Sequence, residues 1–471
     1  MKMAKISRDN NMLFGTNGIR GILGKDLTID SIVDVCYSLG TYFKEGPIVI
    51  GYDGRNSSPT ISKLVRSTIN SAGLEVGDAG LVPTPCLQYA AKRLDYNGGI
   101  MITASHNPPE YNGLKAIAND GVEISREDEL KVQDIYVSKK FSKVDGFARD
   151  FSDQFIIKSY IDAVSALVDI ENIRSRKFTV AVDVGNGAQA KVAPLILSIL
   201  GCRVITINGN IDGNFPGRGP EPTIENLHML SNMVNHSEVD IGVAYDGDGD
   251  RSIFCDEKGD LYGGDKTGTL LVKYLLENKH SGTEIVCPIN TTMALSLIAE
   301  KKSAKLIYTK VGSVEVSREM VKRKSIIGLE ENGGFMYGKL NEVRDGIMTT
   351  ALILDALALS EQKLSSMLSS LPATFQYKSK FKCPTKQIAH DVVSACLKHG
   401  SPQKVETLDG AKIWIDEETW IMVRPSGTEP LIRMYAESTD KLLLNSKVEE
   451  YTRLIKSKID SIDKQTYRQH F

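Results

Sequence analysis

The chain has 471 residues, 41% of them hydrophobic and 25% charged, which is typical of a globular protein with about three or four domains. Its 57 basic and 59 acidic residues leave a net charge of −2, and this balance excludes a global field for nucleic acid or an anionic membrane surface. Without an apolar leader or a membrane-length apolar run, we expect a cytoplasmic protein that binds neither nucleic acid nor membrane; a homo-oligomer stays open.

Residues 1–150 are expected to form the first domain. Apolar periodicity predicts helices over 31–43 and 59–72, and runs rich in β-branched residues predict strands over 47–53 and 99–102. This alternation favours an α/β domain with a largely parallel sheet, in which ligands bind beyond the carboxyl ends of the strands.

A polar loop follows the last of these strands and presents one serine. The loop reads Thr-Ala-Ser-His-Asn-Pro-Pro over 103–109, and its prolines stop any helix, so Ser105 is expected on a turn near His106 and Lys115. A serine beside basic groups is a candidate nucleophile, because an alcohol needs a base and local positive charge to react. The alternative is a serine that bonds only the loop backbone.

A glycine-rich stretch near the start of the chain, Phe14–Gly21, contains a single arginine, Arg20. Glycines let the backbone come close to a ligand, and the guanidinium of Arg20 could donate a forked pair of hydrogen bonds to a phosphate. A tight structural turn is the equal alternative.

Three further units are expected, over 151–256, 257–370 and 371–471. In the first three units an apolar strand leads into a glycine-containing polar loop, which is a weak internal repeat at residues 99–107, 241–250 and 326–334. We therefore predict three related α/β domains with mixed sheets, each delivering one loop to a central cleft, followed by a smaller C-terminal α+β domain.

The loop of the second unit carries three alternating carboxylates, Asp246, Asp248 and Asp250. They could converge on one hard cation, and without it they would repel one another. The pattern resembles an EF-hand calcium loop, with Glu257 at the twelfth position, but Arg251 stands at the sixth, where that loop needs glycine. Mg²⁺ is therefore favoured over calcium, and a solvated acidic turn is a third option.

Two other loops have groups suited to a phosphosugar. The fourth unit offers two guanidinium groups, two hydroxyls and a glycine, a set that suits a phosphate dianion, at Arg424, Ser426, Gly427, Thr428 and Arg433. The third unit offers Glu330 and Asn332, which suit neighbouring sugar hydroxyls. Taken singly, each could be an ordinary turn.

Together these loops resemble the α-D-phosphohexomutase superfamily, which interconverts hexose 1-phosphates and hexose 6-phosphates. The resemblance spans the chain in four motifs and implies that Ser105 carries the phosphoryl group and that Lys115 is a general acid/base. It further implies catalytic roles for His106, Arg20 and Arg251. A Mg²⁺ ion would be held by the Ser105 phosphate together with Asp246, Asp248 and Asp250. The implied substrate contacts come from Glu330, Asn332, Arg424, Ser426, Gly427, Thr428 and Arg433.

The resemblance also implies a mechanism and a substrate class. Phosphorylated Ser105 would give its phosphoryl group to a phosphosugar, form a hexose 1,6-bisphosphate and recover the other phosphate after the intermediate turns over. Many members have serine and histidine where this chain has Asn332 and Gly334, which shifts proton transfer toward Lys115 and His106. The variant loop is similar to that of archaeal phosphoglucosamine and phosphomanno/phosphoglucomutases.

Four functions are compared on these grounds. A mutase acting on glucosamine phosphate comes first, and a phosphomannomutase/phosphoglucomutase comes second. A non-catalytic sugar-phosphate binding protein would be expected to lack Ser105 or a metal carboxylate, and all are present. A serine hydrolase would need a Gly-x-Ser-x-Gly elbow, which the residues around Ser105 do not supply.

Overall fold

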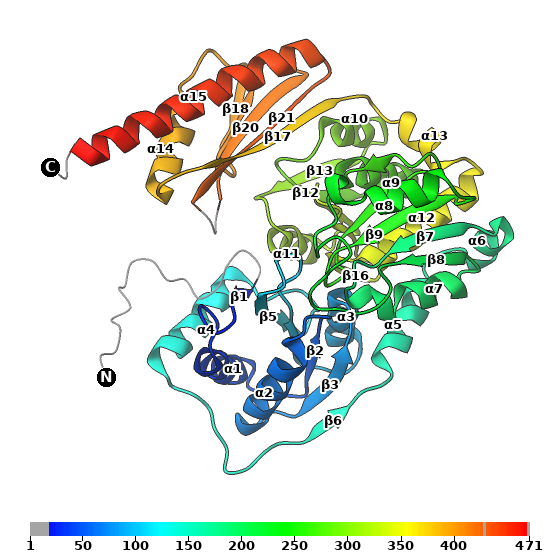
Figure 1. Ribbon diagram of the computed structural model, residues 1–471, viewed down its shortest axis with the longest axis vertical. Helices are drawn as coiled ribbons and strands as arrows, with labels where there is room; N and C mark the ends of the chain where they lie inside the picture. The colour runs from blue at the N-terminus through cyan, green and yellow to red at the C-terminus, as the bar shows by residue number, and fades with distance from the viewer. Residues whose placement is uncertain (1–17, 427–429, 469–471) are drawn as a thin grey trace.

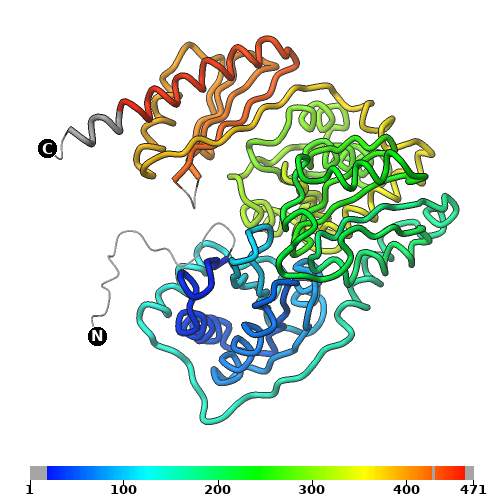
Figure 2. Tube along the Cα trace, viewed as in Figure 1, coloured from blue at the N-terminus to red at the C-terminus, as the bar shows by residue number. Residues whose placement is uncertain are grey.

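The computed structural model describes residues 18–426 and 430–468, which form four units, each built on one β-sheet (Figure 1). The first sheet has six strands and the other three have five each. In Figure 2 the chain passes from the first unit, in blue and cyan, through two adjoining green and yellow units to the orange C-terminal unit. The predicted architecture of three α/β units and a smaller α+β unit is confirmed. No helix in the described part of the chain is long and apolar enough to cross a membrane.

The first sheet is mixed, with the order β1-β5-β4-β2-β3-β6. Strands β4, β2, β3 and β6 are parallel, whereas β5 and β1 are antiparallel to their neighbours. Its elements are β1 (Ile19–Ile22), α1 (Ile29–Phe43), β2 (Ile48–Tyr52), α2 (Ser58–Ser71), β3 (Val76–Leu81), α3 (Thr84–Arg93), β4 (Gly98–Ile102), β5 (Tyr111–Ala118), α4 (Arg126–Ser138) and β6 (Asp150–Ser152).

The second sheet has the order β11-β10-β9-β7-β8. Its elements are α5 (Ile156–Ser165), α6 (Ile170–Arg176), β7 (Thr179–Asp183), the 3₁₀ turn η1 (Ala188–Lys191), α7 (Ala193–Ile199), β8 (Arg203–Ile207), η2 (Ile224–Asn226), α8 (His228–Asn235), β9 (Ile241–Tyr245), β10 (Ser252–Cys255) and β11 (Leu261–Tyr262).

The third sheet has the order β13-β12-β14-β15-β16. Its elements are α9 (Gly264–Asn278), β12 (Glu284–Pro288), α10 (Met293–Lys301), β13 (Lys305–Thr309), α11 (Ser313–Arg323), β14 (Ile327–Leu329), β15 (Phe335–Tyr337), β16 (Asn341–Arg344), α12 (Gly346–Ser360) and α13 (Leu364–Ser369).

The first three sheets repeat one topology. In each, the first strand of the repeat has the second strand on one side and the third on the other, and the fourth strand runs antiparallel beside the third. The three strand orders are β3-β2-β4-β5, β8-β7-β9-β10 and β13-β12-β14-β15. The three loops singled out in the sequence are the equivalent connections between the third and fourth strands. The weak internal repeat is therefore a structural one.

A helix that is apolar on all sides joins the second and third units. Thirteen of the side chains of α12 from Gly346 to Ala358 are buried, because the helix packs on α5 and α6 on one side and on α9 and β15 on another. One continuous hydrophobic core consequently includes residues of the first, second and third units, among them Leu87, Val182 and Leu352.

The fourth sheet is antiparallel throughout, with the order β17-β21-β20-β19-β18, and has its own hydrophobic core. Helices α14 and α15 pack on it, and in Figure 1 α15 runs along its outer side. Its elements are β17 (Phe375–Lys382), α14 (Lys386–Leu397), β18 (Lys404–Glu406), β19 (Ala411–Trp414), β20 (Thr419–Pro425), β21 (Leu431–Ser438) and α15 (Lys441–Arg468).

Candidate active site

The serine loop of the first unit meets the carboxylate loop of the second. Ser105 Oγ donates to Asp246 Oδ2 at 2.9 Å, although the two residues are 141 positions apart. Gly247 lies so close to this loop that a Cβ atom there would come within 2.7 Å of the Ser105 carbonyl oxygen, so glycine is needed for the approach. The serine predicted as nucleophile is thus directly beside the predicted metal loop.

Ser105 itself is buried and has a backbone φ of 51°, a left-handed conformation that non-glycine residues rarely adopt. Its N–H donates to Thr103 Oγ1 at 2.8 Å, and its Oγ lies 3.3 Å from His106 Nδ1. Such a conformation persists when the surrounding contacts hold it, and it occurs often at active sites.

The group that holds this loop is Arg55, which the sequence analysis missed. Its guanidinium is buried, is paired with Asp53 Oδ2 at 3.0 Å and stacks over the Phe215 ring. Its remaining N–H groups donate to four carbonyl oxygens of the serine loop, those of Ser105, Asn107, Pro108 and Tyr111. One usable signal existed, because Asp53 directly follows β2, a parallel neighbour of β4, and polar groups at that edge lie side by side.

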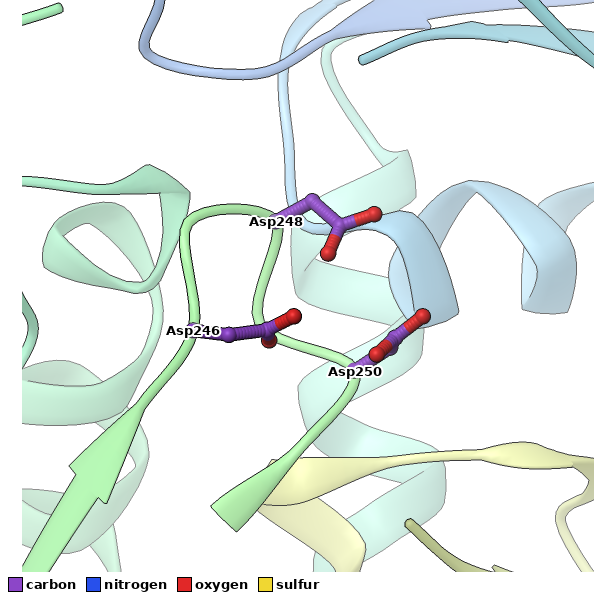
Figure 3. Close-up of side chains that lie close together, drawn as sticks. All are labelled: Asp246, Asp248 and Asp250. Atoms are coloured by element: carbon purple, nitrogen blue, oxygen red, sulfur yellow. The ribbon is translucent and has the colours of Figure 1, made fainter. Parts of the chain in front are cut away.

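Three buried carboxylates converge beside Ser105. Figure 3 shows Asp246, Asp248 and Asp250 leaving one loop after β9 with their carboxyl groups on the same side, and ligand atoms of the three lie within 4.8 Å of one another. Burial, together with the charges of Asp250 and Asp248, raises the pKa of Asp246 well above its ordinary value. Bringing these anions together costs free energy unless a cation compensates for their charge.

The hydrogen bonds of these carboxylates leave room for a cation. Asp248 Oδ2 accepts from Thr84 Oγ1 at 2.6 Å and from Lys115 Nζ at 2.8 Å, whereas its Oδ1 has no hydrogen-bond partner among the described residues. Asp250 shows the same division, with Oδ2 bound and Oδ1 lacking such a partner. Buried oxygens without partners are costly, so the donor set fits a hard divalent ion.

The EF-hand pattern does not fit this loop. Glu257, which stands at the twelfth position of the EF-hand pattern, accepts hydrogen bonds from the backbone N–H and the hydroxyl of Ser365. The loop is followed by strand β10 rather than by a helix. The cluster is therefore a three-aspartate site on a strand-to-strand turn.

Lys115 reaches the cluster from β5. Burial alone would lower its pKa, but the carboxylates of Asp248 and Asp250 outweigh burial and raise the pKa above the ordinary lysine value. Lys115 is therefore a charged group that partly compensates for the anions of the second unit.

His106, Arg20 and Arg251 lie around the serine. The positive charge of Arg251, followed by burial and the charge of Arg20, lowers the pKa of His106 far below its ordinary value, so its ring is neutral at neutral pH. Arg20 Nη1 donates to Asn107 Oδ1 at 2.9 Å, and Arg251 Nη1 lies 3.7 Å from a carboxylate oxygen of Glu221. These cations suit a phosphoryl group, whose charge is negative.

The predicted sugar loop adjoins the carboxylate loop. The Ser252 N–H, one residue beyond Arg251, donates to the Gly333 carbonyl at 3.0 Å. Glu330 is buried and Arg344 connects it to Asp250, while Asn332 Oδ1 accepts from the Gly334 N–H at 3.2 Å. Arg344 and Thr84 were not predicted as site residues.

The predicted phosphate loop connects β20 to β21 in the sequence, and these two strands extend from the fourth unit toward the first in Figure 1. Arg424 Nε pairs with Asp409 Oδ2 of the same unit at 3.0 Å. Gly427, Thr428 and the stretch from Phe14 to Asn17 lie outside the described residues. The role of Arg424 in phosphate binding stays a prediction.

A serine hydroxyl next to buried carboxylates and several cations suits phosphoryl transfer, a reaction in which positioning and charge compensation dominate. Family models agree with this class. Domains I, II and III (alpha/beta/alpha) and the C-terminal domain of phosphoglucomutase/phosphomannomutase match residues 11–143, 158–259, 263–375 and 380–453.

Individual proteins match over nearly their full length. A phosphoglucosamine/phosphogalactosamine mutase of Sulfurisphaera tokodaii is 37% identical, over 95% of this chain and 99% of that protein. A phosphoglucomutase/phosphomannomutase of Thermococcus kodakarensis is 38% identical, over 94% of this chain and 97% of that protein. A crystal structure of a phosphoglucomutase/phosphomannomutase family protein from Burkholderia thailandensis has a TM-score of 0.85 at 25% identity, over 95% and 97% of the two chains.

The chain therefore belongs to the phosphoglucomutase/phosphomannomutase family of phosphohexomutases, which are isomerases. The resemblance inferred from the four loops is confirmed, and membership of an enzyme family of isomerases decides against the serine hydrolase and the non-catalytic binding protein.

Proposed function

We propose that the chain is a Mg²⁺-dependent phosphohexomutase that interconverts glucosamine 6-phosphate and glucosamine 1-phosphate. One observation carries the proposal: the Ser105 hydroxyl is hydrogen-bonded to Asp246 inside a buried cluster in which two further carboxylates each have an oxygen without a hydrogen-bond partner among the described residues. Such a cluster can bind a cation and a phosphorylated Ser105 together.

The residues that would hold Mg²⁺ are Asp246, Asp248 and Asp250, with a phosphoryl oxygen on Ser105 as a further ligand. When bound, the ion would neutralise the charge of the phosphoryl group during an in-line transfer. Arg251 and Arg20 would add positive charge on the same group.

The transfer itself runs between two oxygens. A free hydroxyl of the bound sugar phosphate attacks the phosphorus on Ser105, the bond from phosphorus to Ser105 Oγ breaks, and a hexose 1,6-bisphosphate forms. His106, whose ring is neutral, would take up the hydroxyl proton, and the charged Lys115 would give one to Ser105 Oγ as it leaves. After the bisphosphate reverses its orientation in the site, the same steps in reverse return its other phosphoryl group to Ser105.

The remote loops bind the parts that do not react. Glu330 and Asn332 would accept or donate hydrogen bonds to the sugar hydroxyls. The phosphate that is not being transferred would be held by the loop of the fourth unit, through Arg424, Ser426, Gly427, Thr428 and Arg433.

The choice of glucosamine rests on the Glu-Glu-Asn-Gly-Gly form of the sugar loop and on the name of the relative from Sulfurisphaera tokodaii. The relative from Thermococcus kodakarensis favours glucose and mannose phosphates as the second candidate. Rates of isomerisation of the three 6-phosphates, measured with Mg²⁺ and a trace of the matching 1,6-bisphosphate, should rank glucosamine first.

The phosphoserine is tested by substitution. Ser105→Ala should abolish mutase activity, and the phosphate found on the wild-type protein by intact mass spectrometry should be lost. Ser142→Ala, at an exposed serine of the same unit, is the control and should keep both. Full activity of Ser105→Ala would show that another residue carries the phosphoryl group.

A further inference from the structure

One buried arginine touches both the carboxylate loop and the sugar loop. Arg344, at the end of β16, donates from Nη2 to Asp250 Oδ2 at 2.5 Å and from Nη1 to Glu330 Oε2 at 3.3 Å. Only 5% of Arg344 is exposed, and both carboxylates are buried. A planar guanidinium with two fixed donor directions sets the orientation of both partners, which a lysine could not do.

The bond to Asp250 engages only one of its oxygens. Arg344 and Lys115 both lie on Oδ2, and Oδ1 has no hydrogen-bond partner among the described residues. Arg344 thus fixes the rotation of the Asp250 carboxylate through Oδ2, while Oδ1 accepts no hydrogen bond from the described residues and lies 3.8 Å from Arg251 Nε. Groups that orient a metal ligand in this way affect metal affinity without touching the ion.

Glycine at position 334 makes the path of this arginine possible. A Cβ atom on Gly334 would lie 2.7 Å from Arg344 Cγ and closer still to Cδ, well inside the distance that real Cβ atoms keep. Any side chain at 334 would therefore displace Arg344 from its two carboxylates. A larger side chain such as histidine would meet the same obstacle, because the arginine occupies the space that it would need.

We propose that Arg344 is a positioning residue that fixes the cation site of the second unit relative to the sugar loop of the third, and that Gly334 provides its space. The inference rests on the proposed Mg²⁺-dependent mutase function. The carboxylates of Asp250 and Glu330 are then oriented by the same side chain.

The test measures Mg²⁺ binding by calorimetry on the resting protein without any sugar phosphate, and KM and kcat separately. Arg344→Ala should weaken Mg²⁺ binding about 10- to 100-fold and raise KM, because both carboxylates lose their orientation. The control is Arg318→Met, which removes another partly buried arginine of the third unit, one that pairs with Asp120 of the first. It should lower the melting temperature and leave Mg²⁺ affinity unchanged.

A second pair of variants distinguishes a positioning role of Arg344 from a purely stabilising one. Gly334→Ala should weaken Mg²⁺ binding like Arg344→Ala, but it should change the affinity less than about twofold when added to Arg344→Ala, because the clash is then gone. Unchanged Mg²⁺ affinity in Arg344→Ala, or equal harm from Gly334→Ala in both backgrounds, would overturn the inference. Failure of the wild-type protein to bind Mg²⁺ would instead overturn the proposed function on which it rests.

Discussion

Lys115 donates from Nζ to Asp248 Oδ2 at 2.8 Å, and both side chains are almost fully buried. A lysine of the first unit thus supplies positive charge to the carboxylates that are proposed to bind Mg²⁺ in the second. Its raised pKa follows from these carboxylates, which outweigh burial. When a cation takes up their charge, the pKa of Lys115 should fall toward the range in which it can exchange protons.

Replacing this lysine should separate metal binding from turnover. Lys115→Met should lower kcat about 10²- to 10⁴-fold through loss of a proton-transfer group, yet bind Mg²⁺ at least as tightly as the wild type. Its melting temperature should drop in EDTA, because two buried carboxylates lose a compensating charge, and Mg²⁺ should restore it. Lys131→Met, at an exposed lysine of α4, serves as the control. Weaker Mg²⁺ binding in Lys115→Met would contradict this account.

The contacts of Arg55 with Asp53 and with the serine loop predict that its loss affects both stability and the phosphorylation of Ser105. Arg55→Met leaves the Asp53 carboxylate buried without its ion pair, which should cost about 3–5 kcal/mol of stability. Because the carbonyl groups of the serine loop lose their donor, phosphate on Ser105 should also fall, as measured by intact mass. Adding Asp53→Leu should recover part of the stability but not the phosphorylation. Recovery of both would show that these contacts serve stability alone.

The elements that sequence reasoning placed correctly are those in which an apolar run ends in a polar, glycine-containing loop. Ser105, Asp246 and Glu330 each follow such a strand, and the repeat of one topology puts these loops at equivalent places. Their mutual contacts did not follow from local pattern, because the hydrogen bond from Ser105 to Asp246 depends on how two units pack. The family resemblance supplied that step.

Arg55 and Arg344 show what local pattern leaves out. An arginine in a polar stretch of sequence is usually expected to be exposed to solvent, because arginine is seldom buried without a partner. Each of these arginines is buried because carboxylates and carbonyls from distant segments surround it. The sequence feature connected with Arg344 is the glycine at position 334, which leaves space for the arginine side chain. It did not predict a buried arginine, because a glycine in a loop more often serves a tight turn.

Asp345, the N-cap of α12, should make stability depend on pH. Burial raises the pKa of Asp345 from 3.8 to about 6, against hydrogen bonds from the Met348 N–H and the Tyr160 hydroxyl. Between these values the folded protein binds more protons than the unfolded chain, so the free energy of unfolding falls as pH rises from about 4 to 6. Above pH 6 the whole cost, about 3 kcal/mol, is present.

Asp345→Asn keeps the hydrogen-bond acceptor and removes the charge. The variant should therefore be more stable than the wild type at pH 7, by up to about 3 kcal/mol, and equally stable below about pH 4. Melting curves across this pH range measure the difference, with Asp162→Asn, at an exposed carboxylate of α5, as the control. A variant less stable than the wild type at pH 7 would show that the charge of Asp345 is favourable where it lies.

The fourth unit is attached to the third through Glu437, whose carboxylate is fully buried in the contact. It accepts from the Met293 N–H, at the start of α10, at 2.8 Å and from the Thr292 hydroxyl, so a charge of one unit caps a helix of the other.

Glu437→Ala should cost about 1.5–3 kcal/mol for each of these charged hydrogen bonds and loosen the attachment. Because the predicted phosphate loop belongs to the fourth unit, KM for the sugar phosphate should rise more than kcat falls, and protease should cleave faster between α13 and β17. Glu449→Ala, at an exposed glutamate of α15, should change neither quantity. Unchanged KM and cleavage rate in Glu437→Ala would mean that the apolar contact around Trp420 and Met293 is enough to hold the two units together.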